Sequence, residues 1–408
     1  MKKRFLSAGL AVVMAASLTA CGGSGSASTT AAAAGETKAE GESKAAESSA
    51  AADGASFKIG GIGPVTGGAA VYGLAVQHGA EIAVKEINEA GGINGYPVEF
   101  QFQDDEHDAE KSVNAYNTLK DWGMQVLMGT VTSAPCIAVA DKTAADNMFQ
   151  ITPSGSAVEC AANPNVYRVC YSDPAQGTAS AKYIGEHKLA SKVAVIYDSS
   201  DVYSSGIYEK FAQEAPNQGI EVVDAEAFTA DSNKDFSTQL QKAKESGAEL
   251  VFLPIYYTEA SLILQQANTM GFAPQFFGCD GMDGILQVQN FDVKLAEGLM
   301  LLTPFAADAT DDLTVKFVKS FEDAYGETPI QFAADAYDAM YIIKAAMEEA
   351  NVTPDMAVGD ICAAMEGAMT KIKVDGLTGT NMTWTEDGEP EKDPKAVQVA
   401  DGAYKAME

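Results

Sequence analysis

Two short apolar strands, each followed by a turn rich in hydroxyl groups, constrain the fold of this chain most. Residues 126–128 lead into a turn at 129–133, and residues 148–151 lead into a second turn at 152–156, with a helix-length segment between them. In an open parallel sheet both turns lie at the same edge, where helix N-termini present free N–H groups. This arrangement predicts a site for a small carboxylate, although the Ser and Thr side chains of the two turns also fit simple helix caps, with Ser133 as the first N-cap.

The same alternation of strand and helix continues through most of the chain and indicates an α/β fold with parallel sheets. The two halves of the segment 57–408 repeat this pattern, so we expect two lobes. The expected strands are residues 57–62, 98–103, 126–128, 148–151, 167–169, 192–197, 220–227, 250–253, 275–278, 299–302, 380–384 and 396–400. The expected helices include 235–246, 259–270, 332–350 and 356–369.

The N-terminus has the features of an export signal. Three basic residues at 2–4 precede an apolar run over 5–20, which is too short for a standard membrane span. The run ends Leu-Thr-Ala-Cys, which resembles a bacterial lipoprotein signal in which Cys21 receives the lipid. We therefore predict a signal peptide over 1–20, a lipid on Cys21 and a disordered tether over 21–56, because that segment holds too little apolar surface to fold. An ordinary secretory signal with an incidental Cys is the alternative.

The charge balance and the histidine content exclude several classes of function. The chain carries 57 acidic and 27 basic residues, a formal net charge of −30. Nucleic acids and anionic membrane surfaces bind clusters of Lys and Arg, so we expect neither as a partner. The three histidines (His78, His107 and His187) lack metal-ligand spacing, and we expect no metal, cofactor or catalytic site.

Several short motifs, taken in their order and spacing, resemble the leucine/isoleucine/valine-binding proteins of bacterial ABC importers. The motifs are Phe-Lys-Ile-Gly at 57–60, Gly-Pro-Val-Thr-Gly at 63–67, Ala-Gly-Gly-Ile-Asn-Gly at 90–95, Asp-Asp at 104–105, Ile-Thr-Pro at 151–153, Asp-Phe-Ser at 235–237 and Gly-Cys-Asp-Gly at 278–281. The resemblance covers residues 57–408. It implies the type I periplasmic-binding fold, in which two Rossmann-like lobes with parallel sheets flanked by helices are joined by three crossover segments. The crossovers should lie near Ser172, Thr303 and Leu377, giving one lobe of 57–172 and 304–377 and another of 173–303 and 378–408.

The resemblance also implies which residues bind the carboxylate half of an amino acid. Ser133 matches the serine whose hydroxyl and neighbouring N–H receive the α-carboxylate. Ser154 and Ser156 match a second turn that offers a carbonyl and a hydroxyl to both ends of the zwitterion.

The other half of the implied site is acidic and aromatic. Asp280 matches an acidic residue that pairs with the α-ammonium, and capping of the following turn is its alternative role. Tyr72, Tyr203 and Tyr256 match aromatic positions that line the cleft. A zwitterion needs partners for both charges, because burying either one alone costs several kcal/mol.

This sequence departs from the family pattern at two places. Some members have Glu where this chain has Asp280, which reaches less far. Enterobacterial members carry a disulfide in the first lobe where this chain has His107 and Thr132, so that bridge is absent.

The cysteines allow a different disulfide in an exported protein. Apart from Cys21, five remain, at positions 136, 160, 170, 279 and 362, so at least one is unpaired within the chain. Cys160 and Cys170 are the best candidates for a bridge because they lie close in sequence. Two reduced buried thiols are the alternative.

The sequence thus predicts a non-enzymatic, exported and lipid-anchored protein that captures a free amino acid and delivers it to an ABC permease. We expect a branched-chain ligand and a monomer on the outer face of the cell membrane, although another amino acid or a small carboxylate also fits. Two further functions are alternatives. One is a ligand-sensing module with the same fold, and the other, of a different class, is an exported Rossmann-type oxidoreductase that uses the glycines around Gly61.

Overall fold

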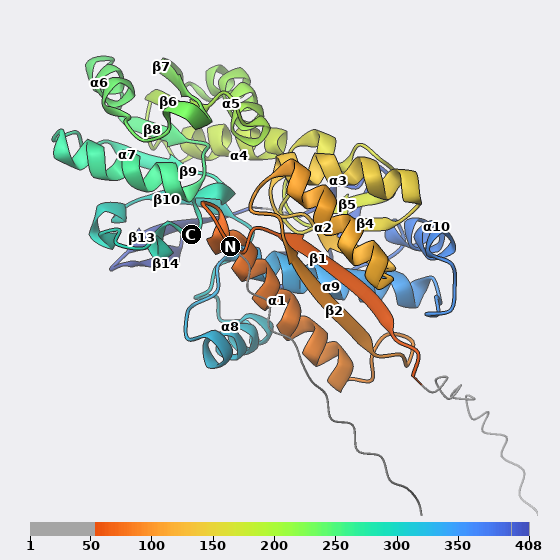
Figure 1. Ribbon diagram of the computed structural model, residues 1–408. Coiled ribbons are helices and arrows are strands. Elements are labelled where there is room, and N and C mark those ends of the chain that lie inside the picture. The colour runs from red at the N-terminus through yellow and green to blue at the C-terminus, as the bar shows by residue number, and fades with distance from the viewer. Residues whose placement is uncertain (1–53, 393, 408) are drawn as a thin grey trace, which may run out of the picture. The chain divides into compact units, whose positions relative to one another are not determined.

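The computed structural model describes residues 54–392 and 394–407, which belong to one compact unit of the chain (Figure 1). The predicted signal peptide, the lipidation site Cys21 and all but the last three residues of the predicted tether lie outside the described residues. None of the described helices is long and apolar enough to cross a membrane.

A five-stranded parallel sheet forms the first half of this unit. Its strand order is β2-β1-β3-β4-β5. The strands are β1 (Phe57–Gly63), β2 (Val98–Asp104), β3 (Val126–Gly129), β4 (Phe149–Thr152) and β5 (Val166–Arg168). Each of the first three is followed by a helix: α1 (Ala70–Glu89), α2 (Ala109–Trp122) and α3 (Ser133–Asp146). The four residues of β3 and of β4 are all buried, as expected for inner strands with both faces covered.

A seven-stranded mixed sheet forms the second half, in the order β14-β13-β10-β9-β8-β6-β7. Five strands are parallel: β6 (Lys192–Asp198), β7 (Glu221–Phe228), β8 (Leu250–Leu253), β9 (Gln275–Gly278) and β10 (Met300–Thr303). The antiparallel pair β13 (Lys395–Ala400) and β14 (Ala403–Ala406) extends this sheet from β10. The associated helices are α4 (Asp173–Glu186), α5 (Val202–Glu214), α6 (Ser237–Glu245) and α7 (Tyr257–Thr269), and short 3-10 turns connect several elements.

Three further helices follow β10: α8 (Asp312–Tyr325), α9 (Gln331–Glu349) and α10 (Val358–Met369). Helix α9 packs against α1, α10, β3 and β4, so the chain has returned to the first sheet by this point (Figure 1). It is buried on nearly all sides, as its long run of small and apolar residues predicts.

The C-terminal segment differs from the prediction in its strands. The strand expected at 380–384 is only β11 (Thr383–Trp384), which pairs with β12 (Pro390–Glu391) as a separate two-stranded ribbon. The Trp384 indole Nε1 donates to the Arg168 carbonyl at 2.8 Å, so this ribbon is fixed beside the end of β5. Strand β14 was not predicted.

Candidate functional site

All seven residues that the sequence nominated for ligand binding line one cavity. They come from both halves of the fold: from α1, the turns after β3 and β4, α5, the residue before α7, and the turn after β9. The lining residues are Tyr72, Val131, Thr132, Ser133, Ser154, Ser156, Tyr203, Tyr256, Asp280, Gly281 and Phe332. The two sheets thus present complementary walls to the same small space.

The two hydroxyl-rich turns form the first wall and are bonded to each other. The Ser133 Oγ accepts hydrogen bonds from the backbone N–H groups of Ser156 at 3.3 Å and Ala157 at 3.1 Å. The Ser154 hydroxyl donates to the Val131 carbonyl at 2.7 Å. Because Ser133 is the first residue of α3, the unused N–H groups of that helix point toward the same wall, which therefore suits an anion.

The N-cap of α3 differs by one residue from the prediction. Thr132, with extended backbone, is the N-cap, and no side chain caps this helix end. The Thr132 Oγ1 instead lies 2.8 Å from His107 Nδ1. His107 and Thr132, the two positions at which the resemblance implied a disulfide in other members, are thus joined here by a hydrogen bond.

Arg168 supports the second turn from behind. Its guanidinium is fully buried and donates to the carbonyls of Ser156 at 2.5 Å and Ala157 at 3.0 Å. Glu389 lies 3.2 Å from its Nε and balances the charge. Arg168 was not nominated from the sequence, although it is the only charged residue in its short apolar strand.

Asp280 forms the opposite wall. Its Oδ1 accepts the Tyr203 hydroxyl at 2.7 Å and the Gly281 N–H at 2.7 Å. Burial raises the pKa of this carboxyl group to about 6, while the hydrogen bond from Tyr203 opposes the increase. A cationic group in the cavity would be a strong additional partner for Asp280.

Aromatic rings close the rest of the cavity. Tyr203 and Tyr256 stack with ring centroids 4.8 Å apart, and Tyr72 stacks on Phe332 at 4.2 Å. These flat faces, together with Val131, leave an apolar wall between the hydroxyl-rich turns and Asp280. Of these residues, Val131 and Phe332 were not nominated from the sequence, where nothing distinguishes them from ordinary core residues.

The cavity is small because the two halves touch around it. Its volume is about 10 Å³, enough for about one water molecule. The Tyr72 hydroxyl donates to the Gly281 carbonyl, the Tyr257 hydroxyl accepts from Val71 N–H at 3.2 Å, and Thr258 donates to the Gly68 carbonyl at 2.9 Å. A molecule larger than water can therefore enter only if these walls separate.

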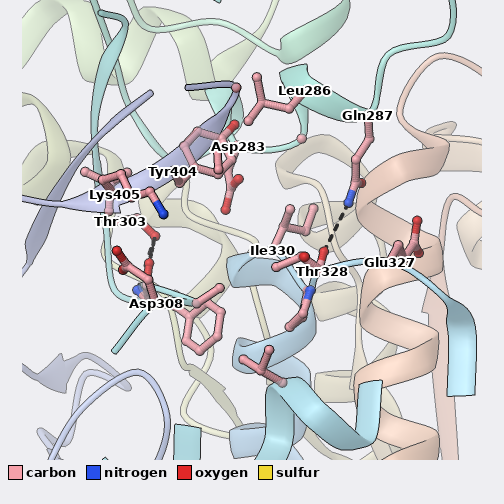
Figure 2. A pocket seen from close by; sticks show the side chains of 18 of the residues that line it. Asp283, Leu286, Gln287, Thr303, Asp308, Glu327, Thr328, Ile330, Tyr404 and Lys405 are labelled. Carbon is pink, nitrogen blue, oxygen red and sulfur yellow. Dashed lines mark hydrogen bonds between the residues drawn. The ribbon is translucent and has the colours of Figure 1, made fainter. Parts of the chain in front are cut away.

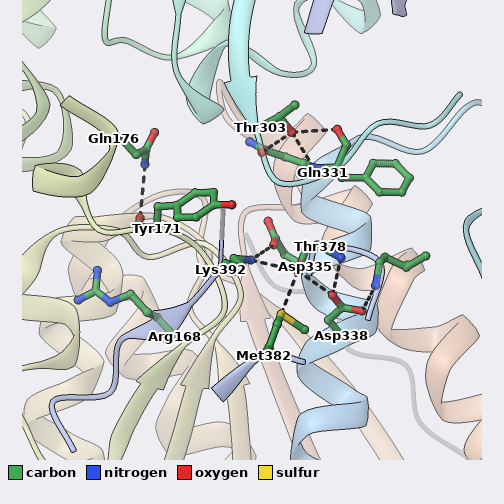
Figure 3. A network of polar contacts seen from close by, with 12 residues as sticks. Arg168, Tyr171, Gln176, Thr303, Gln331, Asp335, Asp338, Thr378, Met382 and Lys392 are labelled. Carbon is green, nitrogen blue, oxygen red and sulfur yellow. Dashed lines mark hydrogen bonds and ion pairs between the residues drawn. The ribbon is translucent and has the colours of Figure 1, made fainter. Parts of the chain in front are cut away.

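A buried polar network lies next to the cavity, where α9 meets three distant chain segments (Figure 3). The Lys392 ammonium lies 3.7 Å from Asp335 Oδ1 and 3.0 Å from Thr378 Oγ1, and both charged side chains are almost fully buried. Asp338 accepts hydrogen bonds from the N–H groups of Leu377 and Thr378, both at 2.8 Å. Burial raises the pKa of Asp335, and Lys392 opposes this increase.

The same network reaches the other two segments. The Lys392 ammonium lies 5.2 Å from the centroid of the Tyr171 ring. One turn before Asp335, the Gln331 Oε1 accepts the Thr303 hydroxyl at 2.8 Å. Side chains at or beside the three expected crossovers therefore meet at one place.

The predicted disulfide between Cys160 and Cys170 is wrong. All five cysteines in the described part of the chain are free and buried. Cys160, in η1 (Val158–Ala161), points toward α3: its thiol donates to the Ser133 carbonyl at 3.6 Å and interacts with the Cys136 thiol. Cys160 instead packs in a small cluster with Cys136 and Ala157, a contact between elements that proximity in sequence does not predict.

The acidic loop after β2 is partly buried. Asp105 is fully buried, and burial raises its pKa to about 7. Its Oδ1 accepts the His107 N–H at 3.0 Å, and Asp108 caps α2. The cluster therefore shapes the turn, and within the described residues no group of His, Cys, Asp or Glu is arranged to hold a metal ion.

The glycines that resemble a dinucleotide fingerprint have a packing role. A Cβ atom on Gly61 would lie 2.4 Å from the Phe102 ring, and one on Gly63 would lie 2.4 Å from Val131. Both glycines lie within β1 itself, so they make room for neighbouring side chains. This observation argues against the oxidoreductase alternative.

Two α/β halves with a polar cavity enclosed between them are typical of proteins that capture small molecules by closing around them. A model of the periplasmic binding protein family matches residues 56–403. The chain belongs to this family, with the type I fold that the sequence motifs implied.

Three known proteins illustrate the similarity. "Leu/Ile/Val-binding protein homolog 3" of Brucella melitensis is 32% identical over 301 residues, 73% of this chain and 80% of that protein. The "leucine-, isoleucine-, valine-, threonine-, and alanine-binding protein" of Pseudomonas aeruginosa is 30% identical over 72% of this chain and 78% of its own length. The crystal structure of LivJ from Streptococcus pneumoniae in complex with isoleucine has a TM-score of 0.77 at 25% identity, covering 86% of this chain and 99% of that one.

Proposed function

We propose that this protein binds a free amino acid in the cavity between its two halves. The observation that carries the proposal is the pairing of walls: two turns rich in N–H and hydroxyl donors face a buried carboxylate. Ser133 would bind the α-carboxylate, the turn of Ser154 and Ser156 would contact both ends of the zwitterion, and Asp280 would bind the α-ammonium. A buried carboxylate opposite an anion site is costly unless a ligand supplies the missing cation, which favours a zwitterion over a carboxylate without an amine.

The ligand class that we propose is the branched-chain amino acids. The names of the similar proteins from Brucella and Pseudomonas include leucine, isoleucine and valine, and the LivJ structure contains isoleucine. In this chain the rings of Tyr72 and Phe332 and the side chain of Val131 offer an apolar surface for an aliphatic side chain. Another small aliphatic amino acid is the runner-up, since the Pseudomonas protein's name also includes threonine and alanine.

The proposed mechanism is closure of two lobes around the ligand, without catalysis. The lobes would comprise 57–172 with 304–377 and 173–303 with 378–408, hinged near Ser172, Thr303 and Leu377. The network of Figure 3 supports this hinge because it gathers side chains at all three places. Ligand contacts made only in the closed form would then shift the equilibrium toward closure.

We further propose that the protein works outside the cell as a monomer that delivers its ligand to an ABC permease. The signal over 1–20 would direct export, and a lipid on Cys21 would anchor the protein through a tether over 21–56. Two acyl chains on one diacylglyceryl group suffice for stable anchoring.

A thermal-shift screen with the twenty amino acids tests the ligand. A ligand at one hundred times its Kd should stabilise the protein by about 2.7 kcal/mol, which raises Tm by a few degrees. We expect leucine, isoleucine or valine to give the largest shift. If no amino acid raises Tm, the proposed function is wrong.

A pair of variants tests the ammonium partner. Asp280→Asn keeps an acceptor for Tyr203 and Gly281 but removes the charge, so the amino-acid response should disappear while the fold is retained. Asp105→Asn is the matched control, because Asp105 is equally buried and lies outside the cavity. Full response in Asp280→Asn would show that another group binds the ammonium.

A further inference from the structure

A second cavity of about 370 Å³ is lined by Asp283 and Gly284, which directly follow the turn that carries Asp280 (Figure 2). It is formed by the turn after β9, the chain from Thr303 to α8, the loop before α9 and the terminal strand β14. Its volume falls in the range of small-molecule sites, and it is far larger than the cavity between the walls described above.

The second cavity has apolar side chains in its interior, and most of the charged side chains that line it are acidic. Leu286, Phe305, Val318 and Ile330 provide the apolar surface. Four carboxylates line it, from Asp283, Asp308, Glu322 and Glu327, against one basic side chain, Lys405. An anionic ligand would meet four carboxylates here, whereas an organic cation with an apolar body matches both the charge and the apolar surface.

Asp283 is the feature that points to a ligand. It is 5% exposed, and Figure 2 shows its carboxylate directed into the space near Tyr404 and Ile330. Its Oδ2 accepts the Gln331 N–H at 2.8 Å, and the carboxylate also interacts with the Tyr404 hydroxyl and the Gly284 backbone. No Lys or Arg of the described residues forms an ion pair with Asp283. Burying a carboxylate whose partners are all uncharged is costly, and an ammonium beside it would reduce that cost.

The other carboxylates are placed differently. Asp308, Glu322 and Glu327 are exposed, so they form a rim above the buried Asp283. Asp283 lies deeper in the cavity than the rim carboxylates. An alkyl chain with a cationic group at each end could therefore contact Asp283 with one group and the rim with the other.

We propose that this cavity is a second binding site, for a primary alkylammonium, and that linear aliphatic diamines bind it best. Asp283 holds the inner ammonium, the apolar side chains contact the methylene chain, and the rim carboxylates hold the outer ammonium.

The second site is also linked to the first one through Gln331. This side chain donates from Nε2 to the Asp280 carbonyl at 2.9 Å, while its backbone N–H donates to Asp283. An amine on Asp283 should therefore change the affinity of the amino-acid site, and by thermodynamic reciprocity the amino acid should change amine affinity by the same factor. This link, unlike the site itself, rests on the function proposed above.

Calorimetric titration of the whole protein with 1,5-diaminopentane, without amino acid, tests the site. We expect saturable binding, weaker binding of n-pentylammonium, and none of the uncharged pentan-1-ol. Asp283→Asn should weaken diamine binding at least about tenfold, and Asp105→Asn should leave it unchanged. Equal binding of pentan-1-ol, no binding of the diamine, or full affinity in Asp283→Asn would overturn the proposal.

If Asp283→Asn does not fold, a second variant tests the site independently. Val318→Phe places a larger side chain in the cavity from α8 and should abolish diamine binding without touching a carboxylate. Retained binding in this variant would place the amine elsewhere and overturn the site. An amino-acid Kd that is unchanged by saturating diamine would overturn the link through Gln331 alone.

Discussion

At the scale of single residues, ligand binding at the candidate site depends on the protonation state of Asp280, which its burial and its hydrogen bonds determine. Burial favours its neutral form, and the hydrogen bonds from Tyr203 and Gly281 favour the charged form. The result is a pKa of about 6, so Asp280 is mainly a carboxylate at neutral pH. Binding of an ammonium should accordingly weaken as the pH falls through about 6.

Tyr203→Phe should shift this pH dependence. The variant removes the 2.7 Å hydrogen bond to Asp280, so the pKa of the carboxyl group rises further. We expect the pH at which amino-acid affinity is half lost to move up toward neutrality, measured as Kd between pH 5 and 9. Tyr256→Phe is the control, because Tyr256 stacks on Tyr203 but forms no hydrogen bond with Asp280. The same midpoint in both variants would contradict the role of Tyr203.

Lys392→Met tests the buried network at the expected hinge. The variant leaves Asp335 and Asp338 without a cation, which should reduce the free energy of unfolding by about 3–5 kcal/mol at pH 8. The loss should be smaller at pH 6, because Asp335 then takes up a proton more easily. Chemical denaturation at both pH values measures it, and the double variant with Asp335→Asn should recover part of the stability. An equal loss at both pH values would contradict this account.

At the scale of elements, most helices and strands follow from local pattern. The observed α6, α7, α9 and α10 begin and end within two residues of the predicted helices, because apolar periodicity and terminating residues are local signals. The pairing of β11 with β12 and the bend at η1 were missed, since both depend on contacts with Arg168 or α3 that lie far away in sequence.

The contact between α1 and α9 depends on Gly79. A Cβ atom at this position would lie 2.1 Å from the Ala333 carbonyl oxygen, so the two helices approach closely only because the side chain is absent. Gly79→Ala should destabilise the protein by about 1–3 kcal/mol despite the better helix propensity of Ala. Chemical denaturation measures the change.

Gly367→Ala in α10 is the matched control for that substitution. Gly367 is exposed, and a Cβ atom there would have no neighbour within 4 Å. The variant should therefore be neutral or more stable by up to about 1 kcal/mol. Equal effects of the two substitutions would show that Gly79 is not a packing position.

At the scale of the whole molecule, several of the many acidic side chains are buried. Several carboxyl groups have their pKa raised by burial: Asp105 to about 7, and Asp201, Asp280 and Asp283 to about 6, with Asp335 raised as well. Such a group stabilises the fold fully below its unfolded pKa, about 3.8, and this contribution is lost as the pH rises through the folded pKa. His78 and His107, whose pKa values are lowered by burial, act in the opposite direction below pH 6.5 but are fewer.

The ligand-free protein should consequently lose stability between pH 5.5 and 8. Differential scanning calorimetry at low ionic strength should show Tm falling across this range. Saturating amino acid should reduce the fall, because an ammonium at Asp280 stabilises the charged carboxylate. A Tm that rises steadily from pH 5.5 to 8 would contradict the assignment of these buried acids.

The sequence by itself determined the α/β class, the two hydroxyl-rich turns and, through its motifs, seven residues of one cavity. These features depend on local periodicity and on short motifs, which a linear chain displays directly. Only the tertiary structure decided that Arg168 supports the second turn, that Cys160 lies beside Cys136, and that Asp283 faces a second cavity. The physical reason is that such contacts join residues from different elements, so their distances and burial exist only once the chain has folded.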